Sequence, residues 1–201
     1  MNLSLKNFVL LEKWAAQMGG VFSISDLRNL FNENNPVLLY RQIKSLVDNK
    51  VLTRFKKEFY VTNTFNAEVL AQKLYPNSYM SLGTVLAKKM LIGSIPEKTV
   101  YSIKTGRTRF FKSQSTSLMY LSIAPHLYFG YEYDNGLRYA IKEKAFIDTL
   151  YFYQKGFTFS FNIFEDIDLS RIDRKKADSM LAQYKNPKFV TFVKGVLSGA
   201  R

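Results

Sequence analysis

Residues 35–47 read Asn-Pro-Val-Leu-Leu-Tyr-Arg-Gln-Ile-Lys-Ser-Leu-Val, and this stretch decides the fold that we predict for the first part of the chain. Asn35 is a good N-cap, and Pro36 suits the first helical position because the N–H that it lacks would have no helical partner there. Four apolar residues then recur at helical spacing: Leu39, Ile43, Leu46 and Val47. The stretch therefore predicts a helix with one face turned toward a core.

The segments on either side of this helix complete a known layout. Residues 5–18 are a predicted helix that ends at the glycine pair 19–20, and its inward stripe is Leu5, Phe8, Leu11, Ala15 and Met18. A short helix is expected to begin at Ser25, an N-cap with Asp26 beside it. Two β-rich runs, 51–55 and 59–61, follow the third helix. This order of elements predicts a winged helix-turn-helix over residues 1–65.

A winged helix-turn-helix binds DNA by placing its third helix in the major groove and its wing against phosphates. The expected contact residues are Val37, Leu38, Arg41, Gln42, Lys44 and Ser45 in the helix, and Arg54, Lys56 and Lys57 in the wing. A three-helix module that binds protein, with solvated lysines, is the alternative. The wing has no glycine to tighten its turn, so the sequence specifies its shape weakly.

Basic side chains dominate the composition. The 29 Lys and Arg residues outnumber the 16 Asp and Glu residues, which gives a formal net charge of +13. Residues 69–131 hold eight basic side chains and a single acid, Glu97. Such a segment repels itself unless a polyanion neutralises it, so nucleic acid is the expected partner, and a merely soluble basic protein is the alternative. The candidate second basic face comprises Lys88, Lys89, Lys104, Arg107, Arg109 and Lys112.

The composition also excludes several classes of protein. The chain has no cysteine, which excludes disulfides, cysteine-ligated zinc and thiol chemistry. No apolar run is long enough to span a membrane, and the first residues lack the basic end and apolar run of a signal peptide. We therefore expect a cytoplasmic protein.

Residues 66–201 predict a second domain, which makes the whole chain α+β. Helices are expected over 67–74, from Ser81 to about residue 92, and over 142–153. Strands are predicted at 99–103, 107–111, 118–123, 127–133 and 137–141, and Asn135-Gly136 between the last two is a strong hairpin signal. Arg107 and Arg109 would share one face of their strand. Because short turns cannot join parallel strands, we expect a mostly antiparallel sheet, followed from about residue 157 by an extended and then helical tail.

Three motifs in this second domain resemble those of the AbiE-type (AbiEi family) antitoxins. The opening of that domain is similar to Ser78-Tyr79-Met80-Ser81-Leu82 with Leu86. Its middle is similar to Tyr128-Phe129-Gly130-Tyr131 followed by the Asn-Gly hairpin and Arg138-Tyr139-Ala140. Glu143-Lys144-Ala145-Phe146-Ile147-Asp148 resembles its "E-K-A-x-x-D" helix. The likeness runs from about residue 5 to residue 155, and one departure is Lys142, where the family often has proline.

The resemblance implies the antitoxin half of a type IV toxin–antitoxin or phage-defence module. Such antitoxins bind repeats in their own promoter through the winged helix and repress transcription. The second domain is implicated in neutralising a nucleotidyltransferase-like toxin, in several members without a stable complex. The alternatives are a general winged-helix transcriptional regulator without an antitoxin role and a protein-interaction module.

The residues give little support to catalysis. His126 is the only histidine, and the sequence gives it no nucleophile and orienting acid of the kind that a catalytic relay needs. The carboxylates do not cluster as in a metal-dependent nuclease, and Lys144 with Asp148 reads as a structural helix pair. We expect no enzymatic activity, no metal and no cofactor; a nuclease or transferase that depends on Glu143 or Asp148 is the third hypothesis.

Overall fold

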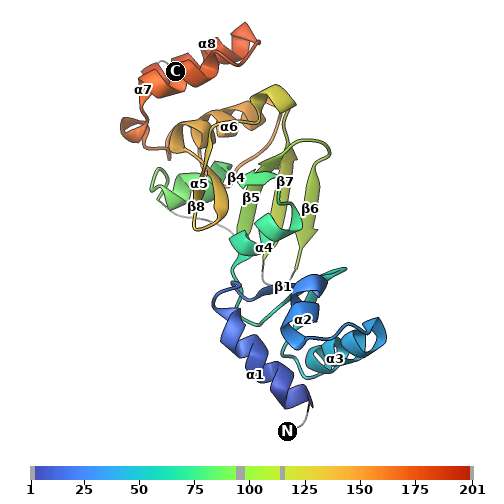
Figure 1. Ribbon diagram of the computed structural model, residues 1–201. Coiled ribbons are helices and arrows are strands. Elements are labelled where there is room, and N and C mark those ends of the chain that lie inside the picture. The colour runs from blue at the N-terminus through green and yellow to red at the C-terminus, as the bar shows by residue number, and fades with distance from the viewer. Residues whose placement is uncertain (1–2, 94–97, 114–115, 200–201) are drawn as a thin grey trace. The chain divides into compact units, whose positions relative to one another are not determined.

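The computed structural model describes residues 3–93, 98–113 and 116–199 (Figure 1). The chain forms two compact units, Met1–Leu74 and Tyr75–Arg201. The boundary therefore lies after residue 74 and not between residues 65 and 66, because the helix α4 (Ala67–Leu74) packs with the first unit. Lys73 at its end donates hydrogen bonds to the carbonyl of Val21 at 2.8 Å and to Asp26 at 2.9 Å.

The first unit has the winged helix-turn-helix layout that the sequence predicts. Its elements before α4 are α1 (Leu3–Ala15), β1 (Val21–Ser23), α2 (Ile24–Phe31), α3 (Pro36–Asp48), β2 (Thr53–Lys56) and β3 (Phe59–Val61). The strands form an antiparallel sheet in the order β1-β3-β2. Its core consists of Leu11, Phe22, Leu27, Leu39, Ile43, Leu46, Leu52 and Tyr60.

The structure corrects the predicted packing of α1. Leu5 and Phe8, expected inside, are exposed, whereas the polar Asn7 is buried. The Asn7 side-chain amide donates a hydrogen bond of 2.8 Å to Gln42 Oε1 on α3. A buried polar side chain needs such a partner, so this bond orients the first half of the helix against its apolar pattern.

The start of α2 also differs from the prediction, because β1 precedes it directly and the N-cap is Ser23, not Ser25. Ser23 and Asp26 form a capping box in which each side chain accepts a hydrogen bond from the other's backbone N–H. Burial by itself raises the pKa of the Asp26 carboxyl, but hydrogen bonds from Ser23 and Lys73 outweigh it and hold the pKa below its ordinary value. The cap thus ties α2 to β1 and, through Lys73, to α4.

The wing turns without a glycine. Lys57 and Glu58 connect β2 to β3, and Glu58 takes a left-handed conformation with φ of 70°. Its carbonyl accepts a hydrogen bond of 2.9 Å from Ile24 N–H. The first turn of α2 therefore holds the wing in place where its own sequence specifies it weakly.

The second unit contains a six-stranded sheet in the order β6-β7-β5-β4-β9-β8. Its strands are β4 (Ser78–Met80), β5 (Thr99–Lys104), β6 (Arg109–Lys112), β7 (Ser117–Ser122), β8 (Tyr131–Asp134) and β9 (Leu137–Ala140). The sheet is mixed, because β5 pairs with β7 and β4 with β9 in parallel, while the other three pairs are antiparallel. The expected mostly antiparallel sheet is thus only partly right: β7 lies between β5 and β6, so consecutive strands are not all neighbours.

The predicted hairpin at Asn135-Gly136 is confirmed. The two residues have φ values of 49° and 79°, as a type I′ turn requires, and Asp134 pairs with Leu137 across it.

Helices cover this sheet and extend beyond it. They are α5 (Leu82–Lys88), α6 (Lys142–Gln154), α7 (Arg174–Leu181) and α8 (Pro187–Ser198), with short 3-10 turns at Pro125–Leu127 and Leu169–Arg171. In Figure 1, α6 lies between the sheet and the helices α7 and α8. Residues 157–161, expected as a possible edge strand, form no strand, and their three phenylalanines pack on one another. Along the described parts of the chain, no helix combines enough length and apolarity to cross a membrane.

Candidate nucleic-acid interface

The helix α3 presents a straight row of exposed side chains. Asn35 caps the helix by accepting hydrogen bonds from the backbone N–H groups of Val37 at 2.9 Å and Leu38 at 3.3 Å. Leu39, Ile43 and Leu46 are buried, which turns the opposite side of the helix outward. That side carries Val37, Arg41 and Lys44, spaced four and three residues apart and all exposed. We call these three residues, together with Leu38, the exposed neighbour of Val37, the α3 row.

The two cations of the α3 row have no acidic partner among the residues that the structure describes. Across residues 3–93, 98–113 and 116–199, neither Arg41 nor Lys44 makes an ion pair. Their positive charge is therefore available to an external anion.

Two other predicted contact residues on α3 are placed differently. Gln42 is half-buried, its oxygen accepting from Asn7 and its amide donating to Glu33 Oε2 at 3.3 Å. It joins α1 to α3 and is not part of the exposed row. Ser45 is half-buried at the edge of the row, and its backbone carbonyl accepts a hydrogen bond of 2.7 Å from the Asn49 side chain.

The wing adds three exposed cations, Arg54, Lys56 and Lys57. Arg54 lies opposite Tyr60 in the hairpin, and burial raises the pKa of Tyr60 while the charge of Arg54 lowers it. Tyr40, an exposed residue of α3, also raises the pKa of Tyr60. Tyr40 was not among the predicted contact residues.

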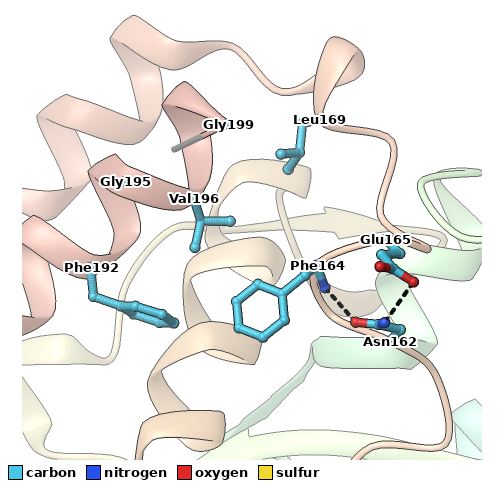
Figure 2. Close-up of a pocket in the computed structure, with 8 residues that line it drawn as sticks. All are labelled: Asn162, Phe164, Glu165, Leu169, Phe192, Gly195, Val196 and Gly199. Atoms are coloured by element: carbon cyan, nitrogen blue, oxygen red, sulfur yellow. Dashed lines mark hydrogen bonds between the residues drawn. The ribbon is translucent and has the colours of Figure 1, made fainter. Parts of the chain in front are cut away.

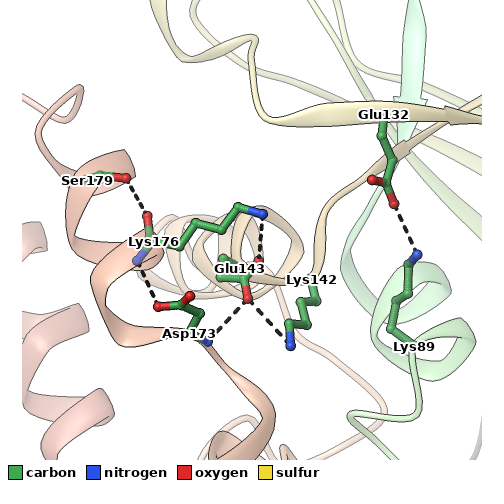
Figure 3. A network of polar contacts seen from close by, with 7 residues as sticks. All are labelled: Lys89, Glu132, Lys142, Glu143, Asp173, Lys176 and Ser179. Atoms are coloured by element: carbon green, nitrogen blue, oxygen red, sulfur yellow. Dashed lines mark hydrogen bonds and ion pairs between the residues drawn. The ribbon is translucent and has the colours of Figure 1, made fainter.

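The six cations of the candidate second basic face do not form one surface. At the end of α5, Lys88 is ion-paired with Asp134 at 3.8 Å, and Lys89 is ion-paired with Glu132 at 3.1 Å (Figure 3); both acids lie in β8. The other four, Lys104, Arg107, Arg109 and Lys112, lie in or next to β5 and β6. The partners of Lys88 and Lys89 lie in β8, one outer strand of the sheet, whereas Arg109 and Lys112 lie in β6, the other outer strand, and Lys104 lies in the inner strand β5.

The last four of these cations differ from one another in burial and in their place in the sheet. Lys104 is buried, donates to the carbonyl of Thr105 at 2.8 Å, and has its pKa lowered by burial and by the charge of Arg109. Arg107 lies in the turn before β6 rather than in the strand, so strand periodicity does not place it beside Arg109. Arg107, Arg109 and Lys112 are exposed.

The first and third sequence motifs of the second unit meet in one buried polar network, formed by Tyr79, Ser81, Lys144 and Asp148. Lys144 and Asp148 are ion-paired and both 0% exposed, which confirms the predicted structural pair. Asp148 also accepts hydrogen bonds from Tyr79 at 3.1 Å and Ser81 at 2.9 Å. Burial raises the pKa of Asp148 and lowers that of Lys144, and the charge of each partner opposes these shifts.

The middle motif encloses this network. Gly130 has φ of 74°, and a Cβ atom there would lie 3.0 Å from the Lys144 side chain. The Phe129 ring centroid lies 5.0 Å from the Lys144 ammonium. Glycine is therefore required at residue 130 both by the backbone and by the approach of Lys144.

Two contacts attach the C-terminal tail to these motifs. Lys144 donates a hydrogen bond of 3.2 Å to the Tyr184 hydroxyl, which lies between α7 and α8. Buried Glu143 accepts a hydrogen bond of 3.2 Å from Asp173 N–H and lies 3.8 Å from Lys142 and 4.0 Å from Lys176 (Figure 3). The tail is thus part of the second unit's packing.

The second unit also has an apolar hollow of about 670 Å³ between α8 and residues 162–169 (Figure 2). Phe164 and Phe192 line it with Leu169 and Val196, and Asn162 bridges Glu165 and the Phe164 backbone at its polar side. Neither this hollow nor the buried network contains His126, which is exposed in the 3-10 turn at residues 125–127. Among the described residues, no group of three or more His, Asp or Glu side chains is placed to hold a metal.

Comparison with known proteins gives a likeness in fold. No family model matches the chain, and no curated protein matches its sequence. Among solved structures, the RV2827C protein from Mycobacterium tuberculosis is similar, with a TM-score of 0.65 and 10% sequence identity, over 100% of this chain and 78% of that one. The likeness supports the α+β fold of this chain: N-terminal helices with a small antiparallel sheet, a mixed six-stranded sheet and C-terminal helices.

Proposed function

We propose that the chain is a transcriptional regulator that binds double-stranded DNA with its first unit, through the α3 row and the wing. The observation that carries this proposal is that Arg41 and Lys44, on the outward side of the third helix of a winged helix-turn-helix, are exposed and make no ion pair with any described residue. An α-helix fits the major groove of B-DNA, and residues in the N-terminal half of a recognition helix contact base edges.

The charges of this interface suit a phosphate backbone. Five exposed cations belong to it: Arg41, Lys44, Arg54, Lys56 and Lys57. If each neutralises one phosphate, the logarithm of the binding constant should fall with the logarithm of salt concentration with a slope of about −4.5. Contacts from the wing would set position and orientation, while the α3 row would supply the contacts to bases.

We further propose the finer role that the AbiE-type resemblance implies, an autorepressor and antitoxin that counteracts a nucleotidyltransferase-like toxin. The support for this step is that residues carrying the resemblance lie together: Tyr79, Ser81, Lys144 and Asp148 form one buried network, and Gly130 lies against Lys144. Motif residues that contact one another in the folded chain are stronger evidence for a shared fold than short matches taken separately. The network is enclosed, so we assign it to the architecture of the unit and not to catalysis.

Binding to the chain's own promoter tests the regulator. We expect a sub-micromolar Kd for a duplex from the region upstream of its own gene, weaker binding to a scrambled duplex of equal composition, and a steep salt dependence, all measured by fluorescence anisotropy. Equal affinity for both duplexes would contradict sequence-specific regulation. Capture of an acidic protein at high salt with no duplex binding would support the protein-interaction module instead.

The antitoxin role has its own test. We expect a reading frame for a nucleotidyltransferase-like protein beside this gene, and we expect co-expression of the chain to restore growth of cells that make it. Promoter binding without such relief would leave a transcriptional regulator and contradict the antitoxin role.

A further inference from the structure

The α3 row begins with two apolar side chains in the first turn of the helix. Val37 is 69% exposed and Leu38 is 42% exposed. A single exposed apolar residue needs no explanation, but these two adjoin Arg41 at the end of the helix that faces base edges in winged-helix proteins. A valine side chain has no hydrogen-bond donor or acceptor, so it can recognise only an apolar group.

The spacing between Val37 and Arg41 sets a distance along the groove. They are four residues apart on the same side of α3, about 6 Å along the helix axis. Successive base pairs of B-DNA are about 3.4 Å apart along the DNA axis and somewhat further apart along the inclined groove, so two groups 6 Å apart along the groove belong to base pairs about one or two steps apart.

Only one base presents an apolar group in the major groove, and that group is the 5-methyl of thymine. Arginine most often reads guanine there, through its O6 and N7 acceptors. Building on the proposed function, we propose that Val37 recognises a thymine methyl and that Arg41 recognises a guanine about one or two base pairs from it. Leu38 flanks the same methyl, and Lys44 continues the row along the groove.

The test removes the methyl from the DNA and the apolar group from the protein. Wild-type full-length chain is titrated with a promoter duplex and with a series in which each thymine in turn is replaced by uracil, which lacks only the methyl. The variant Val37→Ser is titrated with the same series. Val9→Ser on α1 is the matched control, since Val9 is also an exposed valine, at 53%.

We expect one uracil substitution to weaken wild-type binding about fourfold, the effect of losing one buried methyl group. V37S should bind the thymine and uracil duplexes equally, whereas V9S should behave as wild type. Replacing guanines by 7-deazaguanine, which lacks N7, should weaken binding by the wild type but not by Arg41→Ala, at a position about one or two base pairs from the sensitive thymine.

The outcomes separate this inference from the proposed function. Equal binding of thymine and uracil duplexes at every position, with tight promoter binding retained and reduced by R41A, overturns methyl recognition and leaves DNA binding intact. A thymine effect that V37S retains in full also overturns it. No binding of any duplex overturns both proposals.

Discussion

Replacing Lys144 by methionine is expected to lower the free energy of unfolding of the second unit by about 3–5 kcal/mol. Methionine keeps most of the aliphatic stem that packs against Gly130 but removes the ammonium group. The carboxylate of Asp148, 0% exposed, then loses its charged partner and keeps only the hydroxyls of Tyr79 and Ser81. An uncompensated buried charge costs more than the ion pair contributes while intact.

Thermal and urea unfolding followed by near-UV circular dichroism measures this effect, with Lys175→Met as the control. Lys175 is exposed on α7, so K175M should change stability by less than about 0.5 kcal/mol. The double variant Lys144→Met/Asp148→Asn should recover part of the loss, because it removes both charges while Asn retains an acceptor for Tyr79 and Ser81. A K144M variant as stable as K175M would show that the buried network does not hold the second unit together.

The second large effect that we expect is a loss of affinity for promoter DNA. Reversing both cations of the α3 row, in Arg41→Glu/Lys44→Glu, is expected to weaken promoter binding by about 100-fold or more, because attraction to phosphates and bases becomes repulsion. Both side chains are exposed and unpaired within the described chain, so the fold and the unfolding transition should not change. Anisotropy titrations at two salt concentrations measure the affinity and the salt slope.

The matched control is Arg174→Glu/Lys175→Glu on α7, which makes the same change in net charge with the same residue types. It should reduce binding only slightly if the overall charge of +13 contributes little beyond the interface. Equal losses in the two double variants would mean that DNA binding depends on net charge and not on α3.

The parts of the fold that the sequence predicts well depend on local signals. Asn35 and Pro36 mark the start of α3, and Asn135 with Gly136 marks a tight hairpin, since capping and turn geometry are decided within a few residues. The orientation of α1 could not be predicted, because it depends on a hydrogen bond between Asn7 and Gln42, 35 residues later.

The same reason explains what was missed in the second unit. The order of the sheet depends on β7 entering between β5 and β6, and no local pattern encodes which strands become neighbours. Lys88 and Lys89 resembled free basic residues in the sequence, but their acidic partners in β8 lie more than 40 residues away. Of the proposed DNA interface, helix periodicity predicted the α3 row, whereas the internal role of Gln42 needed the structure.

The central claim is that α3 contacts the bases of duplex DNA, and site-directed photo-crosslinking tests it most directly. The chain has no cysteine, so a photo-reactive label can be attached to single-cysteine variants at Lys44 on α3, Lys57 on the wing and Lys175 on α7. With a promoter duplex, we expect crosslinks to bases from position 44, to the phosphate backbone from position 57, and none from position 175. Crosslinks from position 175 with none from position 44, in variants that still bind the duplex, would contradict the account.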